Sequence, residues 1–147
     1  SLLGELTILE NVYLPALCLA QVKDYRKRAA EMLTIVGLRE RLTHYPNEVS
    51  GGEQQRAAIA RALINKPKIL FADEPTASLD AASAKIVLEL FKRLNKDLGQ
   101  TIVMVTHEPE DEKYADRVIW LKDGLIWETS PQYDKIPLTR EGAYLLS

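Results

Sequence analysis

Two short apolar segments, separated by an amphipathic segment of helix length, constrain the fold more than any other feature of this sequence. Residues 68–73 read KILFAD and residues 101–106 read TIVMVT, and both are typical of strands buried on both faces. Between them, residues 81–98 carry apolar side chains at helical spacing, with Asp80 as the predicted N-cap and Gly99 as the stop. A strand, a helix and a second strand in this order predict an α/β fold with a parallel sheet.

The segments on either side of this core extend it. The first fifty residues carry no strand pattern, and 1–22 is expected to be irregular or helical, so we expect a helical subdomain at the N-terminus. The polar tail from Thr129 is expected to contain at most a short helix near 140–146. The other predicted elements are helices over 24–36, 53–65 and 108–115, and a hairpin of 116–121 with 125–128 around an Asp-Gly turn.

Length, charge and cysteine content exclude several classes of protein. The 147 residues are enough for one domain with a core, and a formal net charge of -2 argues against a nucleic-acid-binding protein. Cys18 is the only cysteine, which excludes a disulfide framework and a cysteine zinc site. No apolar stretch approaches the roughly 20 residues that span a bilayer. The first residues resemble the middle of a domain, and we expect no secretory leader among them.

Two carboxylates follow the first apolar strand. Asp73 and Glu74 are predicted at the carboxyl end of 68–73, the edge where open α/β sheets bind ligands. Asp73 is suited to hold a hydrated Mg²⁺, and Glu74 to polarise a water molecule for attack on a phosphoryl group. The alternative interpretation is a strand that ends in two solvated acids.

A histidine follows the second apolar strand. Parallel pairing of the two strands would bring His107 to the same sheet edge as Glu74. An imidazole at this edge can hold a phosphate or orient the attacking water. A surface or capping histidine is the alternative interpretation.

Ser50, Gly51 and Gly52 precede the predicted helix over 53–65. Glycines allow a ligand to approach the backbone closely, and a helix N-terminus presents unpaired N–H groups with a partial positive charge. These residues therefore predict either a phosphate site or a helix N-cap with a glycine-rich entry.

The segment TASLD, residues 76–80, lies between the carboxylates and the helix over 81–98. It is predicted either as a turn in which Ser78 or Asp80 caps the helix, or as a loop that reaches the active site of a partner.

In their order and spacing, these segments together resemble the ATP-binding cassette (ABC) ATPases. Glu53 stands where this family often has glutamine at the end of its signature, but Gln54-Gln55-Arg56 follow as expected. Within the family, the sequences of these motifs are most similar to those of the ATPases of lipoprotein-release and macrolide-export systems. The matching segments are VSGGEQQR (49–56, the signature), ILFADEP (69–75, the Walker B strand and catalytic glutamate), ASLD (77–80, the D-loop) and VTH (105–107, the switch histidine).

The resemblance implies a partial P-loop NTPase (RecA-like) parallel sheet with an N-terminal helical subdomain. It divides the chain into that subdomain over 1–66, the Walker B half of the nucleotide-binding core over 67–128, and a C-terminal tail over 129–147. It further implies an ATPase that powers export, with ATP and Mg²⁺ as cofactors. The implied partners are a second ABC ATPase subunit and transmembrane permease subunits, through which the protein would lie in the cytoplasm at the inner face of the cell membrane.

The resemblance also assigns roles to single residues. The signature would bind ATP held by the second subunit, whereas the Walker B residues and the switch histidine would serve the ATP of their own subunit. The residues concerned are Ser50, Gly51, Gly52 and Glu53 for ATP binding in trans, Glu74 and His107 for catalysis, Asp73 for Mg²⁺ through water, and Ser78 and Asp80 for the D-loop.

Two parts of the family pattern are absent from the chain: a G-x-x-x-x-G-K-S/T loop (Walker A) and the Q-loop glutamine. We therefore expect the C-terminal part of a cassette, which alone neither binds ATP tightly nor hydrolyses it. One alternative is a degenerate subunit that only offers its signature to a partner. The presence of Glu74 and His107 argues against it, because a subunit that had lost its activity would be expected to lose these residues. The other is a C-terminal lobe of a chromosome-maintenance ATPase, which the lack of sustained heptads disfavours.

The missing loop has a consequence for the sheet. In the family, the P-loop strand lies between the switch-histidine strand and the last strand. Without it, the strand over 101–106 would be an unprotected apolar edge, which invites pairing with another chain. We expect either edge-strand dimerisation or a shift of 117–122 against 101–106.

Overall fold

The computed structural model describes residues 1–18, 24–122, 125–127 and 142–146. The chain divides into two compact units, Ser1–Pro67 and Lys68–Ser147, which are described separately.

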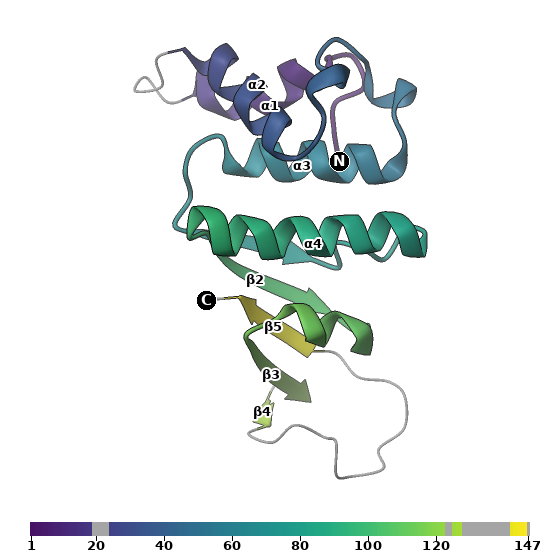
Figure 1. Cartoon of the computed structure of the whole chain (residues 1–147), viewed down its shortest axis with the longest axis vertical. Helices are drawn as coiled ribbons and strands as arrows, with labels where there is room; N and C mark the ends of the chain where they lie inside the picture. The colour runs from purple at the N-terminus through teal and green to yellow at the C-terminus, as the bar shows by residue number, and fades with distance from the viewer. Residues whose placement is uncertain (19–23, 123–124, 128–141, 147) are drawn as a thin grey trace. The chain divides into compact units, whose positions relative to one another are not determined.

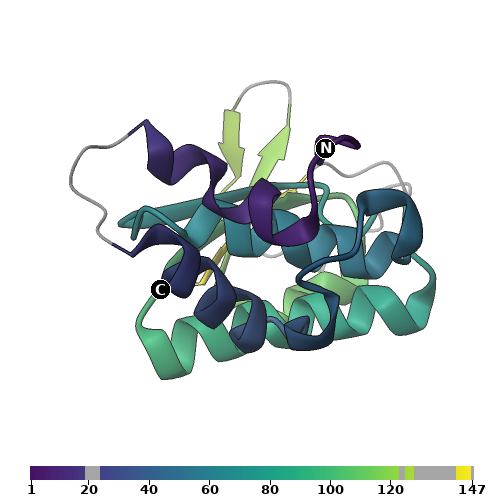
Figure 2. The same ribbon diagram turned by 90° about the horizontal axis from the view of Figure 1, so that it is seen from above.

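Three helices, packed side by side, form the first unit (Figures 1 and 2). They are α1 (Ile8–Leu17), α2 (Tyr25–Ile35) and α3 (Gly51–Leu63), with the short 3-10 helices η1 (Arg39–Arg41) and η2 (Pro46–Glu48) between the last two. Their apolar faces make a common core, as the 3.6-residue spacing predicts. Its fully buried side chains include Ile8, Val12, Ala29, Leu33, Ala57, Ala60 and Ile64.

Within the stretch over 1–22 that is expected to be irregular or helical, the structure has helix α1. It begins where Thr7 and Glu10 form a reciprocal capping box. The side chain of Asn11 is fully buried and binds the backbone of Leu3 in both directions, accepting from its N–H at 2.7 Å and donating to its carbonyl at 3.0 Å. These bonds satisfy a buried amide and fix the segment that precedes the helix.

Helix α3 begins two residues earlier than its apolar spacing predicts. Ser50 is the N-cap, and Gly51 and Gly52 are the first two helical residues rather than a loop ahead of the helix. The cap decides the start, because the Ser50 hydroxyl accepts from the backbone N–H of Glu53 at 3.2 Å.

The second unit contains a mixed sheet and helix α4. Strands β1 (Ile69–Asp73) and β2 (Thr101–Thr106) pair in parallel, with Ile69 opposite Thr101 and Asp73 opposite Val105. The crossover between them is α4 (Ala81–Leu98), which Asp80 caps and Gly99 ends with a left-handed φ of 64°. This confirms the predicted α/β fold with a parallel strand pair. The remaining elements are η3 (Pro109–Tyr114), β3 (Arg117–Lys122), β4 (Leu125–Trp127) and β5 (Gly142–Leu146).

The sheet order is β1-β2-β5-β3-β4, so β5 lies between β2 and β3 (Figure 1). It runs antiparallel to both neighbours, and Tyr144 is paired with Met104 on one side and Val118 on the other. This is the position where the family resemblance places the P-loop strand. The short helix expected near 140–146 is therefore wrong, because pairing on both sides satisfies the strand's backbone groups.

The position of β5 also corrects the expectation for the edge of β2. Thr101–Thr106 is not open for edge-strand dimerisation, and 117–122 has not shifted against it, because β5 covers that side. Among the described strands, β1 and β4 are the edges of the sheet. The predicted hairpin of β3 and β4 is confirmed by their antiparallel pairing, while the Asp-Gly turn at 123–124 lies outside the described residues.

A proline in β5 tests this placement. We expect Tyr144→Pro to accelerate amide hydrogen exchange in β2 and β3, because proline removes a ladder hydrogen bond from a central strand. The matched control Tyr144→Ala keeps the backbone N–H and should leave the protection pattern in place. Equal protection of β2 in both variants, measured by NMR, would show that β5 does not cover its edge.

Candidate functional site

The ends of β1 and β2 bring Glu74 and His107 together. Because the strands are parallel, the two residues, which follow the ends of the strands, lie at the same edge of the sheet. The backbone N–H of Glu74 donates to the carbonyl of Val105 at 2.8 Å, which continues the pairing one residue beyond β1. Glu74 then takes a left-handed φ of 44°, unusual for a residue with a side chain. Such a conformation persists only where the surrounding structure holds it.

The Glu74 carboxylate contacts the His107 ring. Its Oε1 lies 2.8 Å from Nδ1 of His107, and Oε1 of Glu108 lies 3.3 Å from Nε2 on the other side of the ring. The hydrogen bond to Glu74 raises the pKa of His107, and the charges of Glu74, Glu108 and Asp111 act in the same direction. With a carboxylate at each nitrogen, the imidazolium form is favoured. The site can therefore place a proton donor and a carboxylate base side by side.

Asp73 is the last residue of β1 and is exposed. In the part of the chain that the structure describes, its carboxylate makes no hydrogen bond or ion pair, and no group of three or more metal-ligating side chains is present. A single free carboxylate fits Mg²⁺, which commonly takes one or two carboxylates and completes its shell with water and substrate phosphates. Asp73 is thus the residue that would hold the ion, bound together with a nucleotide.

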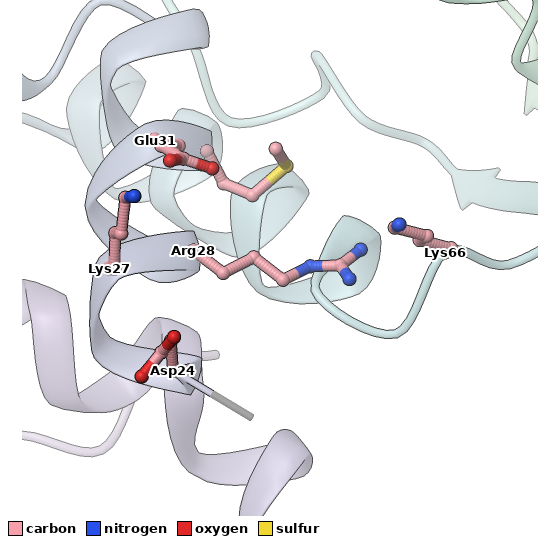
Figure 3. A pocket seen from close by; sticks show the side chains of 6 residues that line it. Asp24, Lys27, Arg28, Glu31 and Lys66 are labelled. Carbon is pink, nitrogen blue, oxygen red and sulfur yellow. The ribbon is translucent and has the colours of Figure 1, made fainter. Parts of the chain in front are cut away.

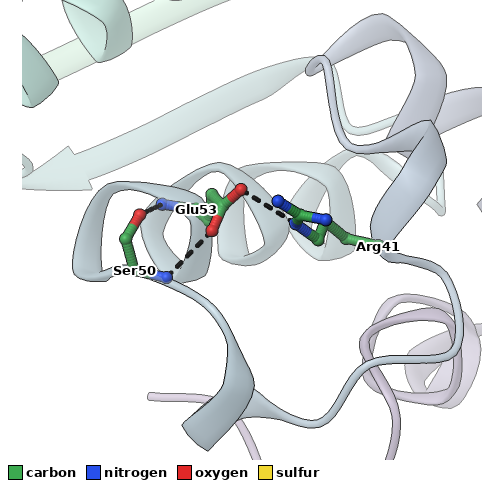
Figure 4. A network of polar contacts seen from close by, with 3 residues as sticks. All are labelled: Arg41, Ser50 and Glu53. Carbon is green, nitrogen blue, oxygen red and sulfur yellow. Dashed lines mark hydrogen bonds and ion pairs between the residues drawn. The ribbon is translucent and has the colours of Figure 1, made fainter.

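The N-terminus of α3 carries the other predicted phosphate site, within the first unit. Glu53 reaches back so that its Oε2 accepts from the N–H of Ser50 at 2.9 Å, while its Oε1 accepts from Nε of Arg41 at 3.1 Å (Figure 4). The N–H of Glu53 is bonded to the Ser50 hydroxyl. Among the described residues, the N–H groups of Gly51 and Gly52 have no acceptor. Two N–H donors with the positive end of the helix dipole behind them are suited to an anion.

The segment after Glu74 contains both D-loop residues. Asp80 caps α4, with its Oδ1 accepting from the N–H groups of Ala82 and Ser83 at 3.0 Å and its Oδ2 accepting from the Ser83 hydroxyl at 2.7 Å. These bonds, led by the backbone bond from Ser83, lower the pKa of Asp80. Ser78 is exposed, and the structure describes no bond of its side chain. The turn interpretation thus holds for Asp80, and a further role of either residue remains a proposal.

Three residues that contact or act on the predicted site residues are not among those predicted from sequence: Arg41, Glu108 and Asp111. Arg41 lies in the polar segment between α2 and α3, and its bond to Glu53 depends on the tertiary fold of that segment. Glu108 directly follows His107, so its proximity was foreseeable. Asp111 is only 4% exposed, although its acidic surroundings predict a solvated helix.

A separate cavity of about 300 Å³ lies in the first unit, at the start of α2 (Figure 3). The Arg28 side chain extends toward Lys66, whereas Asp24, Lys27 and Glu31 lie along the helix. The Nε atom of Arg28 is buried without a partner among the described residues. Acids and bases are mixed around this cavity, which therefore shows no preference for a ligand of one charge.

The pH dependence of stability tests the capping network of α3. The bond from the Ser50 backbone and the neighbouring Arg41 lower the pKa of Glu53 below its ordinary 4.5. A carboxylate with a lowered pKa stabilises the fold above its ordinary pKa, and this contribution is lost as the pH falls through the lower folded value. We expect the wild type to lose more unfolding free energy than Glu53→Gln between pH 6 and about pH 3, measured by urea denaturation. If the unfolding free energies of the two proteins changed equally with pH, the Glu53 carboxylate would not stabilise the fold through this network.

Comparison with known proteins identifies the family of this chain. Residues 1–77 match the family model described as "ABC transporter". The chain is 56% identical over 128 residues to an uncharacterized ABC transporter ATP-binding protein of Methanocaldococcus jannaschii, of which it covers 57%. It is 45% identical to the lipoprotein-releasing system ATP-binding protein LolD 1 of Chlorobium chlorochromatii, with 99% of the chain and 60% of the relative covered.

A solved structure is also similar. The dimeric ATP-binding cassette MJ0796, bound to ADP and phosphate, aligns with a TM-score of 0.72 and 43% identity, covering 86% of this chain and 56% of that one. The chain thus spans somewhat over half the length of the relatives it matches. On the family match, the identities and the shared fold, the chain belongs to the ABC transporter ATPase family.

Proposed function

We propose that this chain is the signature and Walker B part of an ATP-hydrolysing subunit that powers export through a membrane permease. The observation that carries the proposal is the contact of 2.8 Å between Glu74 and His107 at the ends of two parallel strands. Phosphoryl transfer needs mainly positioning and charge stabilisation, and this pair supplies a base for water next to a donor for phosphate oxygen.

Each residue then has a role in hydrolysis. Glu74 takes the proton of the attacking water as its oxygen bonds to the γ-phosphorus, and the bond from that phosphorus to the oxygen bridging to the β-phosphate breaks, so that ADP leaves. His107 donates a hydrogen bond to a γ-phosphate oxygen. Asp73 would hold Mg²⁺ through water, and the ion when bound neutralises phosphate charge. Ser50 and the free N–H groups of Gly51 and Gly52 would bind the γ-phosphate of a nucleotide held by a second ATPase subunit.

The exposed sheet face supports the proposal that further polypeptide completes the core. Phe71 is 74% exposed, and Ile69 and Val105 on the same side of the β1–β2 pair are also exposed. Parallel strands are almost always covered on both faces, whereas in the described part of this unit α4 covers one of them. We therefore expect ATP hydrolysis only where a phosphate-binding loop is supplied together with this chain.

The membrane partner and location are also part of the proposal. Among the residues that the structure describes, no helix has the length and hydropathy that a bilayer crossing requires. Permease subunits would provide the crossing, and the ATPase would lie against them at the cytoplasmic face. The names of LolD and of the macrolide export protein MacB, 46% identical in Chlorobium phaeobacteroides, support an exporter of this kind.

A chimeric cassette tests the function directly. We would replace the matching 128 residues of the M. jannaschii relative with those of this chain and measure phosphate release. We expect the chimera to hydrolyse ATP, and Glu74→Gln to lower kcat by about 10²–10⁴-fold because the base is lost. The isolated chain should show no hydrolysis.

The control for the chimera is Glu89→Gln, which removes an exposed carboxylate paired with Lys85 on α4. It should leave kcat unchanged. A chimera that binds nucleotide but has the same kcat with and without Glu74→Gln would contradict the assignment of the base.

A further inference from the structure

A buried acid lies behind the Glu74–His107 pair. Asp111, in η3, is 4% exposed, and Thr76 and Thr106 are 7% and 0% exposed. The backbone ties these residues to the site, since the N–H of Glu108 donates to the Thr106 hydroxyl at 3.0 Å and the N–H of Asp111 donates to the Glu108 carbonyl at 3.1 Å. The hydroxyls of Thr106 and Thr76 and the charge of Glu74 all act on the Asp111 carboxyl, so three segments of the second unit bring polar side chains to one buried place.

Three oxygen atoms in this place are buried and have no hydrogen-bond partner among the described residues. They are Oδ2 of Asp111, Oγ1 of Thr76 and Oε2 of Glu74. Leaving such atoms unpaired is unfavourable, so a small movement that pairs the hydroxyl with a carboxylate oxygen is favoured. Of the three, the Thr76 hydroxyl is the group that carries a proton, so it can donate to a carboxylate oxygen of Asp111 or of Glu74.

We propose that Asp111 is a positioning residue of this site: with the Thr76 hydroxyl it holds the turn that carries Glu74, and so keeps Glu74 against His107. The left-handed backbone at Glu74 requires such a restraint, and Thr76 lies only two residues further along the chain. The inference rests on the proposed function only in naming the site that Asp111 serves.

The charges around Asp111 are consistent with this role. Burial raises the pKa of Asp111, and the nearby carboxylates of Glu108 and Glu74 raise it further, while the Thr106 and Thr76 hydroxyls lower it. Among the described cations, the closest along η3 is Lys113, which pairs with Glu110 instead. An acid that served packing alone would be replaced at lower cost by an apolar side chain, because burying a carboxyl without a cation is unfavourable.

Two substitutions at Asp111 distinguish its effect on the position of Glu74 from the effect of its own charge on His107. Asp111→Asn and Asp111→Leu both remove the carboxylate charge that acts on His107, but only D111N keeps polar atoms that can bond Thr76 and Glu74. We expect the His107 pKa, measured by NMR of the ring, to be lower in D111L than in D111N, because Glu74 moves away from Nδ1 only in D111L. The Thr76 and Ala77 amide signals should shift in D111L and stay near their wild-type positions in D111N.

Thr76 provides the second pair of variants. Thr76→Ser keeps the hydroxyl and Thr76→Val removes it at nearly constant volume, and we expect T76V alone to lower the His107 pKa. This pair also keeps the test valid if D111L fails to fold, which circular dichroism would show. Equal His107 pKa values within each pair would overturn the proposal. No nucleotide is present in this experiment, so its outcome is independent of whether the chimera hydrolyses ATP.

Discussion

The parallel pairing of β1 with β2 is the constraint on which the candidate catalytic site depends. It places Asp73 opposite Val105, so Glu74 and His107 leave the sheet at one edge and meet at 2.8 Å. Neither side chain would be near the other if the register slipped, because neighbouring residues of a strand point to opposite faces. Packing of α4 on the inner residues of β2 stabilises this register from one side.

The signature half of the site depends on a different local interaction. In the capping box, the N–H groups of Ser50 and Glu53 are hydrogen-bonded, and no described residue accepts from the N–H groups of Gly51 and Gly52. Each half is formed by contacts inside one unit of the chain, without a phosphate-binding loop. We therefore propose that the chain carries two preformed parts of composite sites, which the proposed partner subunit and loop would complete.

Much of this could be predicted from sequence because the determining interactions are local or periodic. The strand at 68–73, the helix over 81–98 and the approach of His107 to Glu74 all follow from apolar spacing and parallel pairing. The place of β5 could not be predicted, because the choice of strand neighbours depends on contacts between distant residues such as Tyr144 and Met104. Asp111 was missed for a related reason, since its acidic neighbours favour a solvated face and only tertiary packing buries it.

The most direct test of the account is the pKa of the His107 imidazole in the wild-type chain and in Glu74→Gln, measured by NMR titration. If strand pairing holds the carboxylate against Nδ1, the wild-type pKa lies above the ordinary 6.5 and falls when the charge of Glu74 is removed. A wild-type pKa at its ordinary value that does not change in Glu74→Gln would contradict the account, because the two strands would then not bring the pair together.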